Sequence, residues 1–180
     1  MITQAAEYDT GAKSFHCLTV ALLGSQFIIG WIMPGVRHDT QPEVLISLHF
    51  SMGLVILAVT AARLLWRLAV GVPAPEKGLP RRQHQAAEAL HTALYMLLFA
   101  LVVSGWAYAS SHGIAVTLFG VATVPGIFAN GSGTGRAIGE LHSPLGWVLL
   151  AAMGLHIAAA LYHHFWRRDR VLRRMLPWVG

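Results

Sequence analysis

Cysteine and charge are scarce in this sequence of 180 residues. Cys17 is the only cysteine, so neither an intrachain disulfide nor a Cys-x-x-Cys-His haem attachment can form. Charged residues make up 12% of the chain, about half the fraction usual in a soluble domain, while 55% of the residues are hydrophobic. We therefore expect a membrane protein that holds any haem without a covalent bond.

Four apolar segments are long enough to cross a bilayer, for which a helix needs about 20 residues. A fifth apolar stretch, 114–129, is shorter and contains glycine and proline, so we expect it to be a short interfacial helix in a loop. The predicted spans are approximately 14–33, 44–66, 89–109 and 143–166. These features predict an all-α membrane protein, with a four-transmembrane-helix bundle forming a single domain over residues 1–180.

Basic residues lie mostly on one side of this four-span arrangement. Arg37 and Arg136 lie on one side, and the other eleven of the 13 Lys and Arg residues lie on the side of both termini. Because cytoplasmic loops are rich in Lys and Arg, we expect both termini to be cytoplasmic. The basic cluster 167–174 is expected to anchor this topology by binding anionic lipid. The pI near 10.0 reflects the same asymmetry, and without a groove-binding motif we expect no nucleic-acid partner.

Four of the ten histidines are predicted to lie at two matching depths in the membrane. Ionisable side chains are costly in hydrocarbon, so each is a functional candidate. His142 and His156 are 14 residues apart on the last span, nearly four turns, and share one face. Chain direction places His49 at the level of His142 and His16 at the level of His156. We therefore expect an outer pair (His49, His142) and an inner pair (His16, His156).

Two imidazoles from facing helices can occupy both axial positions of a haem iron. Such ligation leaves no open position for oxygen, so it suits electron transfer. Gly53 and Gly146 each follow an outer histidine by four residues, where a flat macrocycle needs clearance. Zinc and copper also bind imidazole, and four unrelated hydrogen-bonded histidines are a further alternative. A carboxylate-rich metal site is excluded, because no Asp or Glu lies inside a predicted span.

The residues around these histidines resemble those of the bacterial cytochrome b561 family. The matching segments are Ser14-Phe15-His16, Ile46-Ser47-Leu48-His49, Leu141-His142, and the run from Gly154-Leu155-His156 through His163 and His164 to Trp166. The resemblance covers essentially the whole chain and extends to short, stand-alone di-haem cytochromes of the bacterial inner membrane. It implies two b haems on the four histidines, with no catalytic residue distinct from the haem ligands.

The resemblance also implies an electron acceptor and, for some members, a donor. Short members exchange electrons with ubiquinone at the cytoplasmic side, and some oxidise superoxide outside. His163 and Lys77, the only lysine of the loop after the second span, are the implied quinone-site residues. From its spacing to His49, Arg63 is a candidate partner for an inner haem propionate, or a residue whose charge reaches the headgroups. His91 is expected to have a supporting or interfacial role, because no partner matches its depth.

The leading hypothesis is therefore an oxidoreductase that passes electrons from superoxide through two haems to quinone. A positive outer surface would steer superoxide inward. The outer loops instead combine two arginines with three acidic residues, Asp39, Glu43 and Glu140. One alternative is a di-haem carrier or anchor subunit for a dehydrogenase or hydrogenase, docked through the outer loop 110–141. Another is a haem-free transporter or scaffold, which an absorption spectrum would distinguish.

Overall fold

The computed structural model describes residues 7–36, 43–76 and 78–176. Within this part of the chain, four helices are long and apolar enough to cross a membrane, which confirms the predicted spans. They are α1 (Thr10–Ile32), α2 (Val44–Val70), α3 (Arg81–Ser111) and α5 (His142–Tyr162), the last continued by the π-helical turn η1 (His163–Arg167). α3 begins eight residues before the predicted third span. Hydropathy marks only the apolar part of a helix, whereas the backbone hydrogen bonds of α3 extend into the polar residues that precede it.

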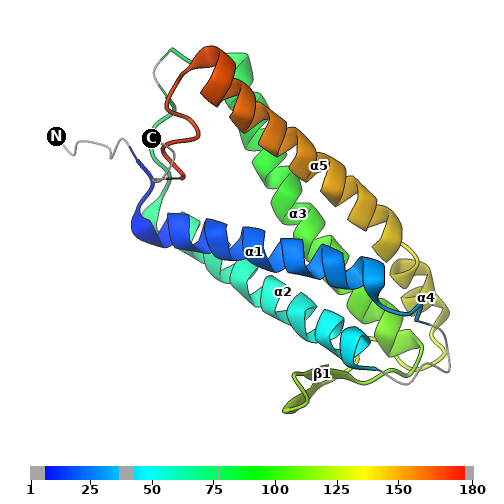
Figure 1. The fold of residues 1–180 in the computed structure, drawn as a ribbon. Helices are drawn as coiled ribbons and strands as arrows, with labels where there is room; N and C mark the ends of the chain where they lie inside the picture. Colours follow the sequence, from blue (N-terminus) through cyan, green and yellow to red (C-terminus); the bar gives the residue numbers. More distant parts are fainter. Residues whose placement is uncertain (1–6, 37–42, 77, 177–180) are drawn as a thin grey trace.

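The spanning helices are arranged as two pairs, α1 beside α2 and α3 beside α5 (Figure 1). Contacts between α2 and α3 join the pairs into one bundle. The start of α1 and the end of α5 lie at one end of the bundle, here called the terminal end (Figure 1). The opposite end, called the hairpin end, carries the long loop between α3 and α5. An aliphatic cluster with one side chain from each spanning helix packs between the two ends: Leu23, Ile56, Leu98 and Leu149.

Large hydrophobic side chains cover the outward surfaces of the spanning helices. Val20 of α1, Leu68 of α2, Met96 of α3 and Ile157 of α5 are all more than half exposed. Exposure to water would cost roughly 25 cal/mol for each Å² of apolar surface, whereas lipid tails are as apolar as these side chains. The chain is therefore a multi-pass membrane protein, with lipid as its surroundings.

The loop at the hairpin end differs from the prediction. The prediction of an interfacial helix over 114–129 is wrong. This stretch instead forms an antiparallel β-hairpin of β1 (Val116–Leu118) and β2 (Ala122–Val124). The turn contains Phe119 and Gly120, both with positive φ. Glycine adopts such angles without strain, and the β-branched residues on either side favour strands. Apolar content alone could not distinguish this hairpin from a short helix.

A serine of α2 fixes the hairpin against the bundle. The Oγ of Ser51 lies 2.8 Å from the carbonyl oxygen of Thr117 and accepts a hydrogen bond from the Phe119 N–H at 2.9 Å. Ser51 itself is almost fully buried. Beyond the hairpin, the short helix α4 (Gly133–Gly139) packs on α3 and leads into α5. The loop is therefore an ordered cap over the hairpin end.

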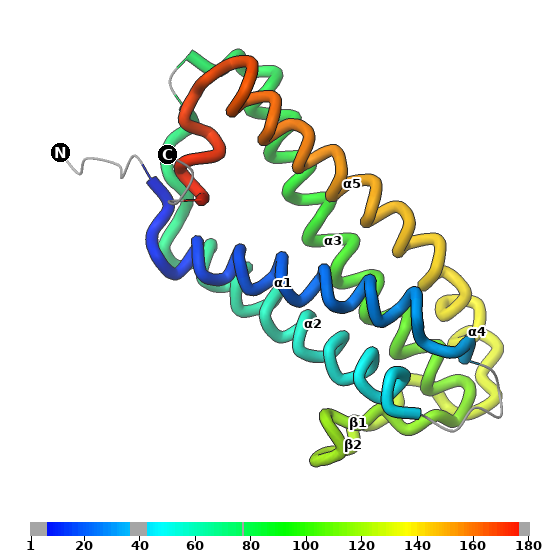
Figure 2. Tube along the Cα trace, viewed as in Figure 1, coloured from blue at the N-terminus to red at the C-terminus, as the bar shows by residue number. Residues whose placement is uncertain are grey.

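The C-terminal segment folds back across the terminal end. After η1 the chain reverses at Arg168, whose φ is 51°, and returns toward the start of α1 and the α2–α3 loop (Figure 2). Arg174 pairs with Glu76 at 3.7 Å and donates a hydrogen bond to the Ala74 carbonyl at 2.7 Å. Arg174 is 7% exposed, so the expectation that the whole basic cluster serves anionic lipid is wrong for this residue.

A second ion pair ties the N-terminal residues to the same segment. Arg170 pairs with Glu7 at 3.2 Å. The hydrogen bond from Lys13, at 3.0 Å, holds the pKa of Glu7 below its usual value, so its carboxylate stays charged at neutral pH. Because Glu7 is well exposed, this pair contributes little to stability and mainly sets the path of the chain.

Candidate functional site

Two histidines from different helix pairs face each other toward the hairpin end. The ring centroids of His49 on α2 and His142 on α5 are 6.0 Å apart, with an interplanar angle of 81°. The Nδ1 of His142 lies 2.8 Å from the carbonyl oxygen of Leu101. A carbonyl oxygen only accepts hydrogen bonds, so this Nδ1 carries the proton and the lone pair of Nε2 is free. His142 is thus held in the tautomer that a metal ligand requires.

A cavity of about 500 Å³ surrounds these two rings, and all four spanning helices line it. Three buried polar atoms on its lining residues have no hydrogen-bond partner within the described chain: His49 Nδ1, Gln26 Oε1 and Trp106 Nε1. Buried polar groups in proteins are nearly always paired. Their grouping around one apolar cavity indicates a large ligand with polar groups of its own, and a haem with its propionates fits that description.

Glycines on facing helices give the two rings their room. A Cβ placed on Gly105 of α3 would lie 2.8 Å from Cε1 of His142, closer than any side chain can approach. A Cβ on Gly30 of α1 would lie 3.4 Å from Cε1 of His49. The absence of a side chain at these two positions therefore leaves space for the rings of His142 and His49.

Gly53 and Gly146, the two glycines predicted from the sequence to give clearance, do not lie as close to the histidine rings as Gly105 and Gly30 do. Gly53 and Gly146 line the cavity, as expected for clearance beside a ligand. A Cβ on either residue would meet its nearest neighbour at an ordinary distance, 3.7 and 3.9 Å respectively. Spacing within one helix identifies neighbours on that helix only, so it could not reveal the closer glycines on α1 and α3.

Three histidines lie together toward the terminal end. The ring centroids of His16 on α1 and His156 on α5 are 6.3 Å apart, and His91 of α3 lies 5.2 Å from His156. The structure therefore brings His16 and His156 to the level that the sequence predicts for them. The expectation that His91 has no partner at its depth is wrong. Because α3 begins at Arg81, His91 lies well inside the helix rather than at its start.

The ring separations leave space for an iron atom between two imidazoles. Two metal–nitrogen bonds of about 2 Å each, with about one ångström from each nitrogen to its ring centre, span about 6 Å. The pairs His49–His142 and His16–His156 have this separation, whereas His91 and His156 are closer. Among the described residues, no group of three or more His, Cys, Asp or Glu side chains could hold a bare metal ion. A metal here would need further ligands from a cofactor, as the macrocycle of haem provides.

Arg63 of α2 lies beside His16 inside the bundle. Its guanidinium donates a hydrogen bond to Nδ1 of His16 at 3.2 Å and lies over the ring of Tyr95, 5.6 Å from the centroid. Arginine only donates, so His16 accepts at Nδ1 and carries its proton on Nε2. Coordination through Nε2 requires the opposite tautomer. Arg63 must therefore turn to another acceptor when His16 binds a metal.

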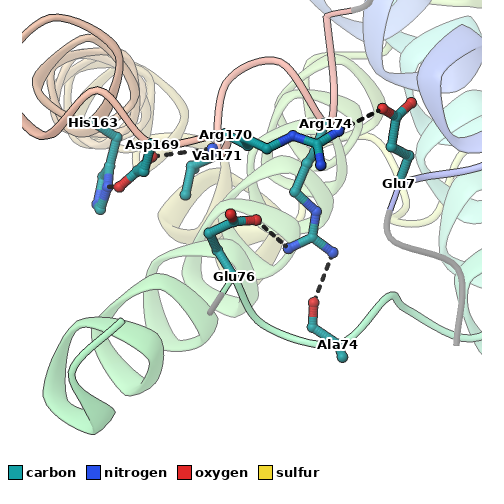
Figure 3. A network of polar contacts seen from close by, with 8 residues as sticks. All are labelled: Glu7, Ala74, Glu76, His163, Asp169, Arg170, Val171 and Arg174. Carbon is teal, nitrogen blue, oxygen red and sulfur yellow. Dashed lines mark hydrogen bonds and ion pairs between the residues drawn. The ribbon is translucent and has the colours of Figure 1, made fainter. Parts of the chain in front are cut away.

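His163 follows α5 at the terminal end and has an acidic partner. Its Nδ1 lies 2.5 Å from Oδ2 of Asp169, which the chain reversal at Arg168 brings back toward it (Figure 3). Sequence reasoning missed Asp169, although a lone acid inside a basic cluster, six residues after His163, was a usable signal. Lys77, the other predicted quinone-site residue, lies outside the described residues.

Comparison with known proteins agrees with this architecture. Residues 7–178 match the family described as prokaryotic cytochrome b561. The chain is 31% identical over 170 residues to cytochrome b561 homolog 2 of Escherichia coli (strain K12), covering 94% of this chain and 90% of that protein. It is 28% identical over 176 residues to the probable superoxide oxidase CybB of Yersinia pestis, with 92% and 97% covered. It is 27% identical over 182 residues to cytochrome b562 of Cereibacter sphaeroides, with 97% and 98% covered.

The match spans nearly the whole chain, including every spanning helix and all the histidines in the two clusters. The four apolar helices fit the bundle of this family, and the histidine-lined cavity fits its b-type haem. The chain therefore belongs to the prokaryotic cytochrome b561 family, which carries b-type haem and transfers electrons across the membrane.

Proposed function

We propose that the chain carries electrons across the membrane through two b haems, one held by His49 and His142 and the other by His16 and His156. The observation that carries the proposal is the contact of 2.8 Å between Nδ1 of His142 and the Leu101 carbonyl, which leaves Nε2 free beside a cavity of about 500 Å³. Haem supplies one-electron redox chemistry when bound. The chain would supply imidazole ligands for the iron, an apolar enclosure and a fixed separation between the two sites. His142 and His156 are 14 residues apart, or about 21 Å along the helix axis.

In this proposal the terminal end faces the cytoplasm. Ten of the 13 Lys and Arg residues belong to the loop, helix ends and terminal segments on that side, and Arg63 lies in the half of α2 nearer that end. Lys and Arg near the ends of spanning helices are retained on the cytoplasmic side during insertion. Both termini are then cytoplasmic, and electrons that enter at the hairpin end move inward.

We propose superoxide as the donor at the hairpin end and ubiquinone as the acceptor at the terminal end. Two superoxide ions release two electrons and two dioxygen molecules, and one ubiquinone takes both electrons and two protons to form ubiquinol. The name of the Yersinia pestis relative supports the donor. Beside His163, Phe165 and Trp166 are 70% and 80% exposed. In a membrane such apolar side chains would meet lipid, from which a lipid-soluble quinone would arrive. By resemblance, Lys77 contributes a second polar contact to the quinone.

The test uses purified, haem-loaded protein. Superoxide alone should reduce the haems, seen as the change of the haem absorption bands, and ubiquinone added afterwards should oxidise them again. The donor role is contradicted by haems that stay oxidised with superoxide but are reduced by dithionite. The acceptor role is contradicted by reduced haems that persist after ubiquinone is added.

A second function, as a carrier or anchor subunit for a dehydrogenase or hydrogenase, is favoured by one observation. The tip of the β-hairpin exposes Phe119 by 55% and Val121 by 88%, although Ser51 holds the strands in place. Exposed apolar surface at the end of a bundle is typical of a docking site. Sustained turnover of superoxide and quinone by the purified chain alone would exclude the need for such a partner.

Arg63 is proposed to pair with a propionate of the haem held by His16 and His156. Replacing Arg63 by Gln removes a positive charge that favours the reduced iron, so the midpoint potential of this haem should fall by about 60 mV, roughly tenfold in the one-electron equilibrium. Redox titration followed by haem absorption measures the change. Arg63→Lys keeps the charge and should restore most of the potential. A Gln variant with the wild-type potential would contradict the pairing.

A further inference from the structure

We propose that Asp169 is a positioning residue for quinone reduction, which it serves by fixing the orientation of His163 through Nδ1 and by balancing the positive charge of the ring when Nε2 also carries the proton that passes to the quinone. The inference rests on the proposed function, because it concerns the site where quinone is reduced. It assigns a role to a residue on the C-terminal segment, outside the four spanning helices.

The contact between the two side chains is short and shielded. Nδ1 of His163 and Oδ2 of Asp169 are 2.5 Å apart, and the side chains are 13% and 18% exposed. A carboxylate oxygen accepts, so Nδ1 carries the proton and points at Asp169 (Figure 3). Nε2 of the same ring is then left for another partner. Nδ1 is thus fixed by the carboxylate and Nε2 can contact a substrate, as in sites where an acid orients a catalytic histidine.

The fold keeps Asp169 in place through backbone and side-chain contacts. The Asp169 N–H donates to the His163 carbonyl at 3.2 Å, and the Val171 N–H donates to Oδ1 of Asp169 at 3.1 Å. Nε of Arg167 lies 3.9 Å from Oδ2, which adds a positive charge beside the carboxylate. Farther along, Arg174 fastens the segment to the α2–α3 loop (Figure 3). These contacts define a single position for the carboxylate.

The chemical step balances as follows. Each quinone oxygen that becomes a hydroxyl needs one electron, which reduced haem would supply when bound, and one proton. For one of the two oxygens, the Nε2–H bond of doubly protonated His163 breaks and an O–H bond to the quinone oxygen forms. The Asp169 carboxylate compensates the positive charge of the ring before the transfer and keeps the Nδ1 proton afterwards. Cytoplasmic water then returns a proton to Nε2.

Replacing Asp169 by Asn exchanges the donor and acceptor roles in the hydrogen bond between residue 169 and Nδ1 of His163. The amide oxygen can keep the Val171 N–H, which turns the amide nitrogen, a donor, toward Nδ1 of His163. Nδ1 must then accept, and the remaining proton moves to Nε2 in a ring with no carboxylate to balance a second proton. We expect oxidation of pre-reduced haems by decylubiquinone, followed by stopped-flow absorbance, to slow about 10- to 100-fold at saturating quinone. Haem content and potentials should be unchanged.

Two variants provide the comparison. Asp169→Glu keeps the carboxylate and should recover much of the rate. Glu88→Gln removes the acid of another histidine–carboxylate pair, His84–Glu88 at 3.3 Å, which is on the exposed start of α3 and should have no effect. Nitrogen-15 NMR of the histidine rings, with His163→Gln used for assignment, should show the proton on Nδ1 in the native chain and on Nε2 in Asp169→Asn.

The outcomes separate the two proposals. Native protein whose reduced haems are not oxidised by decylubiquinone would overturn quinone reduction and this inference together. If the native protein is oxidised and Asp169→Asn matches its maximal rate, only the role of Asp169 is overturned. The same holds if the variant needs more quinone but reaches the native maximum, or if the NMR tautomer is unchanged.

Discussion

Replacing His142 by Ala should reduce the haem content from two per chain to one and stop electron entry at the hairpin end. Among the described residues that line the cavity, the substitution leaves His49 as the only imidazole, because the partner ring 6.0 Å away is removed. Loss of a residue that merely orients a metal ligand already costs about 10- to 100-fold in affinity. Loss of the ligand itself should therefore exceed about 100-fold and leave this site empty at ordinary haem concentrations.

The measurement is a haem-to-protein ratio with an absorption spectrum, combined with the rate of haem reduction by superoxide. The haem proposed for His16 and His156 would report that the variant is folded, because these two residues come from different helix pairs, on α1 and α5. His84→Ala removes an exposed histidine and should retain both haems. Loss of both haems, or of neither, in His142→Ala would contradict the assignment of His49 and His142 to one haem.

Replacing His16 by Ala should remove the second haem, whereas replacing His91 by Ala should retain it. His16 and His91 compete for the role of partner to His156, at 6.3 and 5.2 Å. The shorter separation is less than two metal–imidazole bonds require. Moreover, His91 lies on α3, which packs directly beside α5. His16 approaches from the other helix pair.

The two variants are compared by haem content and by redox titration. In His16→Ala, one redox transition should disappear and oxidation of the remaining haem by quinone should become much slower, because the haem site nearer the proposed quinone site is lost. In His91→Ala both transitions should persist, with a shift in the potential of one haem. The reverse result, retention in His16→Ala and loss in His91→Ala, would assign His91 and His156 as the ligands.

The sequence was sufficient for the spans and for the levels of the histidines. Long apolar runs specify spanning helices because every backbone polar group must be paired within the hydrocarbon. Once the spans are known, chain direction alternates, so the depth of His16, His49, His142 and His156 follows from counting along regular helices. The family match confirms the type of protein that these features predicted.

Contacts between helices and loops depend on how these elements pack against one another, and only the tertiary structure decided them. The helix register places Gly105 against His142 and His91 against His156, and neither contact leaves a signal within one helix. The hairpin formed where an interfacial helix was expected, because the buried hydroxyl of Ser51 pairs its backbone groups. Asp169 reaches His163 only because the chain reverses at Arg168. Periodicity and hydropathy describe each helix alone, whereas such contacts depend on side-chain packing between helices.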